Sequence, residues 1–112
     1  MKILINADKS VGDYDALTVR VDGVVRAALR HLSDRITRVE VHLADENGAK
    51  EGGEDKRCMM EARLEGRQPV AVTSHGDSFD AAVHDAATSL AKTIDSALAR
   101  VEARRGTHDA NV

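Results

Sequence analysis

Residues 57–75, RCMMEARLEGRQPVAVTSH, decide the fold, because they hold two runs of alternating side chains joined by a turn. Alternation with a period of two is typical of a strand with one buried face. The turn is Gly66-Arg67-Gln68, and Pro69 opens the second run, where its missing N–H does least harm. In the first run, residues 57–65, we expect these side chains to point inward: Cys58, Met60, Ala62 and Leu64.

Two further strands are predicted upstream of this hairpin. Residues 38–43 (RVEVHL) alternate in the same way, with Val39, Val41 and Leu43 on the side expected to be buried. Residues 2–6 (KILIN) form a short run rich in β-branched side chains. The three consecutive strands 38–43, 57–65 and 69–75 favour an antiparallel meander.

Helical spacing of apolar residues predicts two helices. The first stripe runs from Ala16 to Leu32, and Ser33-Asp34 ends it. The second runs from Phe79 to Val101, with Ser78 or Asp77 as the N-cap.

The order is therefore β-α-β-β-β-α. It predicts a single α+β domain over residues 1–105, with a four-stranded sheet and both helices packed on one face. A short polar tail is expected over residues 106–112.

Composition limits the function. Tyr14 and Phe79 are the only aromatic residues, which argues against recognition of bases by a stacking platform. Cys58 is the single cysteine, so there is no internal disulfide, and a reducing cytoplasm is expected. No apolar run is long enough to span a bilayer, and the first ten residues do not form a signal peptide.

Two longer segments carry a family resemblance. They are LSDRITRVEVHL (32–43) and GRQPVAVTSHGDSFDAAVHDAATSLAKTIDSAL (66–98), which includes the start of the second helix at Ala81-Ala82-Val83. With the first strand and helix, residues 1–105 resemble the ribosome hibernation promoting factor and ribosome-associated inhibitor family, also called sigma-54 modulation proteins. The chain resembles the short form, without the C-terminal dimerisation domain of the long members.

The resemblance implies a βαβββα fold and a translation inhibitor that acts under stress. Such proteins bind the small ribosomal subunit between its head and body, where mRNA and tRNAs would otherwise bind. Inhibition is by steric occlusion, without an enzymatic step or a cofactor. The implied partner is ribosomal RNA; no membrane or small-molecule substrate is expected, and the oligomeric state stays open.

Family members hold ribosomal RNA through Lys and Arg repeated along both helices. The matching residues here are Arg20, Arg26, Arg30, Lys92, Arg100, Arg104 and Arg105. On the first helix, Gly23 and Ala27 lie between Arg20 and the pair formed by Arg26 and Arg30, so a phosphate backbone could approach closely. The alternative is a solvated face in which these arginines pair with Asp22 and Asp34.

The second helix has fewer basic residues than is usual in the family, with Ser89 and Ser96 at positions where a basic residue is common. Its polar residues divide into two flanks, and only one flank is expected to meet a polyanion. Ser89, Lys92, Ser96 and Arg100 form one flank, and Asp80, His84, Asp95 and Glu102 form the other. Arg104 and Arg105 could instead complement the dipole at the helix C-terminus.

Other chemistry is not indicated. The five histidines show no metal-ligand spacing, and Cys58 is expected to be a core residue. No nucleophile, base and orienting residue occur together, and no phosphate-binding glycine loop is present, so an enzyme is not expected. The acidic segment 45–56 is expected to be a loop that points away from RNA.

Two other function classes fit the same pattern. Double-stranded RNA-binding domains share the topology, but their second helix opens with a Lys-rich motif, and this one opens with Ser78-Phe79-Asp80-Ala81. The other class is a small interaction protein that has lost ribosome binding and associates through its open sheet face or an edge.

Overall fold

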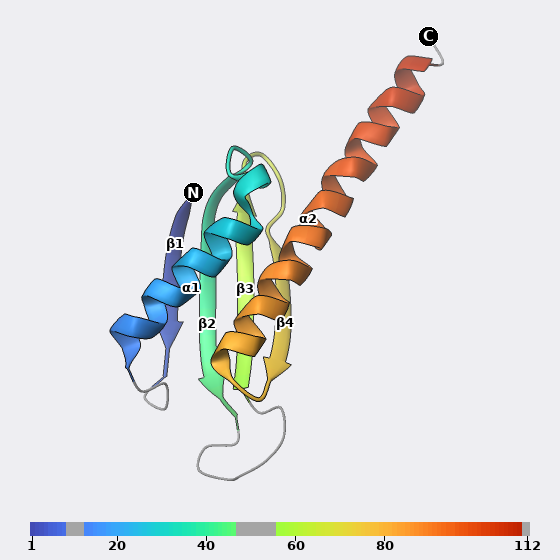
Figure 1. The fold of residues 1–112 in the computed structure, drawn as a ribbon. Coiled ribbons are helices and arrows are strands. Elements are labelled where there is room, and N and C mark those ends of the chain that lie inside the picture. Colours follow the sequence, from blue (N-terminus) through green and yellow to red (C-terminus); the bar gives the residue numbers. More distant parts are fainter. Residues whose placement is uncertain (9–12, 47–55, 111–112) are drawn as a thin grey trace.

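The computed structural model describes residues 1–8, 13–46 and 56–110, with side chains described as far as Val101 (Figure 1). The elements follow the order expected from the sequence. They are β1 (Lys2–Ala7), α1 (Tyr14–Ala28), a 3₁₀ turn η2 (Arg30–Leu32), β2 (Ile36–Asp45), β3 (Lys56–Leu64), β4 (Val70–Gly76) and α2 (Phe79–Ala110).

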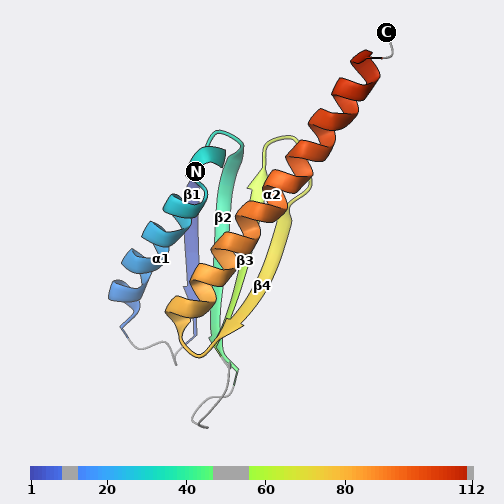
Figure 2. The ribbon, with the colours of Figure 1, turned by 45° about the vertical axis from the view of Figure 1, so that its right-hand side comes forward.

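The four strands form one mixed sheet in the order β1-β2-β3-β4. β1 is parallel to β2, and the other two pairs are antiparallel, with Val41 opposite Met60. Both helices lie on the same face of this sheet, and the other face is uncovered (Figures 1 and 2). The predicted α+β fold with its antiparallel meander is confirmed.

The core lies between the covered face of the sheet and the inner sides of the helices. Every residue expected to point inward from residues 38–43 and 57–65 is buried. The helices contribute mainly Leu17, Val21 and Val25 from α1, and Val83, Leu90 and Ile94 from α2. The predicted inward-facing sides of these two strands are therefore confirmed.

β2 begins two residues before the predicted start, at Ile36. The register shifts between Ile36 and Arg38, so the strand is irregular at Thr37, whose hydroxyl donates to the Arg63 carbonyl at 3.0 Å. Because of this bulge, Ile36 and Val39 are both buried although they are three residues apart. A strict period of two therefore missed the start of the strand.

The predicted first helix is divided in the structure. α1 starts two residues earlier than expected, at Tyr14, where the Asp13 side chain accepts a hydrogen bond from the Ala16 N–H at 3.1 Å. It ends at Ala28, and the η2 turn then places Leu32 in the core. The tighter winding of a 3₁₀ turn lets the chain reverse into β2 while it keeps an apolar residue inward.

α2 begins as predicted, because the Ser78 hydroxyl accepts from the Ala81 N–H at 3.1 Å. The helix continues to Ala110, past the predicted boundary at residue 105 and into the segment expected to be a tail. Its C-terminal part projects beyond the sheet (Figures 1 and 2). Within the described ranges, no helix has the length and apolar character needed to cross a membrane. Residues 47–55 of the expected acidic loop lie outside the described residues.

Cys58 gives a direct test of the register. Its side chain is fully buried on the covered face, and burial raises its pKa to about 12 from an ordinary value of 9.0, against a smaller opposing effect of Arg57. A thiol with this pKa holds about a thousandfold less thiolate near neutral pH. We expect Cys58 to react with a disulfide reagent at pH 8 at least about 100-fold more slowly in the folded protein than in denaturing urea. Equal rates in the two conditions would contradict the register.

Candidate nucleic-acid interface

The outer side of α1 carries a shallow hollow of about 320 Å³ beside the predicted arginines. Its lining includes Arg26 and Arg30, with Gly23 and Ala27 beside them. Gly23 is exposed, and a Cβ built on it would meet nothing within 4 Å. The packing of this chain therefore gives no reason for a glycine here, and the position leaves room for an approaching backbone.

A second, larger hollow lies in the groove between α1 and α2. Its volume is about 750 Å³. Gly23 and Ala27, which line the first hollow, also line this one. Arg20 of α1 and Asp80 of α2 also line this groove. Gly23 and Ala27 thus separate Arg20 from Arg26 and Arg30, as the helical spacing predicted.

Two of the predicted arginines form ion pairs. Arg20 Nε lies 3.1 Å from Asp80 Oδ1, and Arg26 Nε lies 2.8 Å from Asp22 Oδ2. Arg26 also donates from Nη1 to the Met1 carbonyl at 3.4 Å. The sequence anticipated the pairing of Arg26 with Asp22, four residues away on the same helix, but not the contact between the helices. Both pairs are about half-exposed, and such pairs contribute only about 0–1 kcal/mol to stability.

The acidic flank of α2 faces α1. Asp80 meets Arg20 there, and both carboxylate oxygens of Asp95 lie 3.0 Å from His31 Nε2 in η2. From Asp95, Lys92 is displaced by about 60° and Arg100 by about 140° around the helix axis. The orientation of this helix, with Asp80 toward α1 and Asp95 toward η2, is the part that sequence reasoning missed.

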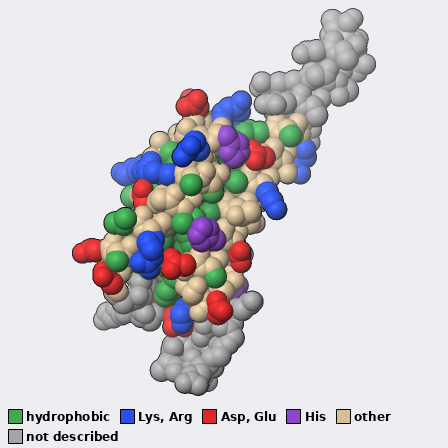
Figure 3. Space-filling model, in the orientation of Figure 1, with side chains coloured by type: hydrophobic (Ala, Val, Ile, Leu, Met, Phe, Trp, Pro, Cys, Tyr) green, Lys and Arg blue, Asp and Glu red, His purple; other side chains and the backbone are tan. Residues whose placement is uncertain are grey.

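The remaining candidates are exposed cations. Arg30, Lys92 and Arg100 have no ion-pair partner in the part of the chain that the structure describes. Arg104 and Arg105 belong to α2, but their side chains lie outside the described residues. Figure 3 shows the side of the molecule with the helices, where basic side chains lie over both helices with acidic and histidine side chains among them. This arrangement is suited to scattered phosphate contacts and not to one uniformly basic patch.

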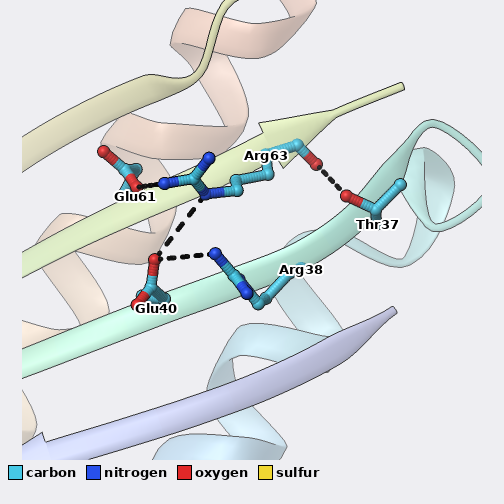
Figure 4. A network of polar contacts seen from close by, with 5 residues as sticks. All are labelled: Thr37, Arg38, Glu40, Glu61 and Arg63. Atoms are coloured by element: carbon cyan, nitrogen blue, oxygen red, sulfur yellow. Dashed lines mark hydrogen bonds and ion pairs between the residues drawn. The ribbon is translucent and has the colours of Figure 1, made fainter. Parts of the chain in front are cut away.

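The open face of the sheet has a different arrangement of charges (Figure 4). Glu40 and Glu61 are directly opposite each other on β2 and β3. Arg63 lies 3.8 Å from Glu40 and 3.5 Å from Glu61, and Arg38 lies 3.4 Å from Glu40. The arginines thus offset two like charges that would otherwise destabilise the strand pair. Arg38 and Arg63 already have a structural role on this face.

The described residues also bear on metal binding. Nowhere among them do three or more His, Cys, Asp or Glu side chains gather in a way that could hold a metal ion.

Comparison with known proteins supports the fold. No protein-family model matches the chain, and no curated protein sequence matches it. Among solved structures, the N-terminal domain of Protein Y from Thermus thermophilus matches with a TM-score of 0.66 at 20% identity, over 84% of this chain and 96% of that one. A ribosomal subunit interface protein from Coxiella burnetii matches with a TM-score of 0.59 at 12% identity, over 92% of this chain and 99% of that one.

Both solved structures match the family that the sequence resembles. The resemblance is thus confirmed at the level of the fold, over nearly the whole of both structures.

Gly23 yields a prediction about stability. A glycine inside a helix costs about 1 kcal/mol relative to alanine, and nothing near Gly23 would obstruct a methyl group. We expect Gly23→Ala to raise the free energy of unfolding by about 0.5–1 kcal/mol in urea titrations. The matched control is Gly76→Ala, because a Cβ at Gly76 would lie 2.9 Å from the Ala82 backbone nitrogen. That variant should lose at least about 1 kcal/mol. A loss of stability in Gly23→Ala would show that the glycine is needed for packing.

Proposed function

We propose that this protein is a ribosome-associated factor that occupies the decoding region of the small subunit and stops translation under stress. The observation that carries the proposal is the fold, which is shared almost end to end with a protein named for the ribosomal subunit interface. The likeness to the Protein Y domain supports the same role. The exposed cations on both helices supply the means of contact.

The proposed mechanism is steric and involves no reaction. Phosphate groups of ribosomal RNA would bind the exposed basic residues, and the body of the domain would fill the space that mRNA and tRNAs need. Arginine forks suit phosphate oxygens. Gly23 has no side chain and Ala27 only a methyl group, so the RNA backbone can approach the helix closely. The contacts read no bases, because the chain has only two aromatic residues for stacking.

The shape of the protein fits occlusion. The molecule measures 61 × 25 × 19 Å along its principal axes, and α2 accounts for the long dimension. The projecting part of this helix carries Arg100, Arg104 and Arg105 away from the sheet. We propose that this part extends the RNA contact beyond the body of the domain.

A second candidate is an interaction module without ribosome binding. The observation that favours it is the acidic flank of α2, which places Asp80 and Asp95 between the basic residues of α1 and those on the far flank of α2. Ribosome binding decides between the two candidates.

Binding of small subunits over a salt series tests the proposal. We expect replacement of Arg26, Arg30, Lys92 and Arg100 together by Gln to weaken binding at least about tenfold near 0.1 M salt. The magnitude of the salt slope should fall by about one unit or less for each phosphate interaction that the variant can no longer make. Circular dichroism and the urea midpoint check that the variant is folded.

The control variant carries the same change in charge on the opposite face and the hairpin. It replaces Lys2, Arg57, Arg63 and Arg67 by Gln, and its fold is checked in the same way because Arg63 also offsets Glu40 and Glu61. We expect less than about a threefold change in affinity. Equal reductions in affinity for the two variants would contradict binding through the helices. No binding by the wild-type protein at low salt would overturn the ribosomal proposal and favour the interaction module.

A further inference from the structure

Three arginines of α1 and η2 line the two hollows, and two of them, Arg26 and Arg20, form ion pairs with Asp22 and Asp80. We propose that these two carboxylates mask Arg26 and Arg20 from a bound polyanion and so lower the affinity of the helical face for RNA. This inference rests on the proposed function for its biological ligand, namely phosphate groups of ribosomal RNA. The geometry of the two ion pairs is independent of that function.

Each carboxylate takes the Nε–H of its arginine and so closes one of the two donor pairs through which a guanidinium can bind a phosphate. Asp80 Oδ1 accepts from Arg20 Nε at 3.1 Å, and Asp22 Oδ2 accepts from Arg26 Nε at 2.8 Å. The Nε–H is part of the planar set of donors with which an arginine grips two oxygens at once. While the ion pair is formed, a phosphate must either displace the carboxylate or bind through Nη1 and Nη2 alone, and Arg26 Nη1 already donates to the Met1 carbonyl at 3.4 Å.

Displacement is easy but does not remove the negative charge. Both pairs are about half-exposed to solvent, where ion pairs are weak and exchange readily. The displaced carboxylate remains on its own helix, within a few ångströms of the incoming phosphate. Repulsion between the two anions then opposes binding. The mask therefore reduces affinity without blocking the site.

The masking is confined to part of the cation set. Among the described residues, Arg30, Lys92 and Arg100 lack such a partner. Asp95 of α2 contacts His31 of η2 and none of the candidate cations. Asp22 and Asp80 are thus singled out by their contacts among the acidic residues of the helical face.

The experiment measures polyanion binding by Asp22→Asn, Asp80→Asn and the double variant. The probes are a heparin column and isolated small ribosomal subunits. We expect each substitution to raise the affinity for subunits by about 3- to 10-fold near 0.1 M salt, and the double variant to elute from heparin at higher salt. The matched control is Glu65→Gln, an exposed residue after β3 with the same change in charge, for which less than about a twofold change is expected.

A double-mutant cycle separates masking from the general effect of charge. Asp22→Asn is repeated with Arg26→Gln present, and Asp80→Asn with Arg20→Gln present. If the carboxylates act through their arginines, the gain in affinity should fall to the level of the Glu65→Gln control. A gain that persists without the arginine would overturn the inference.

The two probes keep this inference distinct from the ribosomal proposal. Equal effects of Asp22→Asn, Asp80→Asn and Glu65→Gln on heparin elution would refute the masking. If the masking is seen on heparin while no variant binds subunits, the inference stands and the ribosomal proposal fails. If the wild-type protein binds subunits and the Asn variants bind no tighter, the ribosomal proposal stands and the masking is wrong.

Discussion

Burial of one face of the sheet beneath the two helices is the constraint on which the rest of the structure depends. Val39, Val41 and Met60 are completely buried there, and Val25 and Leu90 close over them from the helices. Burial of each such side chain stabilises the folded protein by about 1.5–3 kcal/mol relative to leaving that side chain exposed. This packing fixes how α1 and α2 lie on the sheet, and so it fixes which of their polar flanks face each other.

That geometry sorts the charges into two different surfaces. On the open face, the register of β2 and β3 places Glu40 directly opposite Glu61. Arg38 and Arg63 offset the repulsion between these two negative charges. On the helical face, Arg20 of α1 and Asp80 of α2 both line the groove between the helices and form an ion pair. A polyanion that binds this protein through its helices must therefore compete with carboxylates that already belong to the site.

A fold held by an alternating apolar pattern tolerates wide change elsewhere. The likeness to two solved structures at 20% and 12% identity fits this, because the core needs apolar side chains at alternating positions and not particular ones. Surface charge is free to vary on such a frame. The ion pairs on the helical face are thus features of this chain's own sequence, and Asp22 and Asp80 take part in two of them.

The sequence by itself determined the order of the elements, the inward-facing sides of β2 and β3 and the burial of Cys58, because these follow from local periods of two and 3.6 residues. It also placed Gly23 and Ala27 between the arginines of α1. Only the tertiary structure decided that β2 starts at a bulge, since an extra residue breaks the period. The pairing of Arg20 with Asp80, sixty residues apart, was likewise settled only in three dimensions, since contacts between helices depend on how both rest on the sheet.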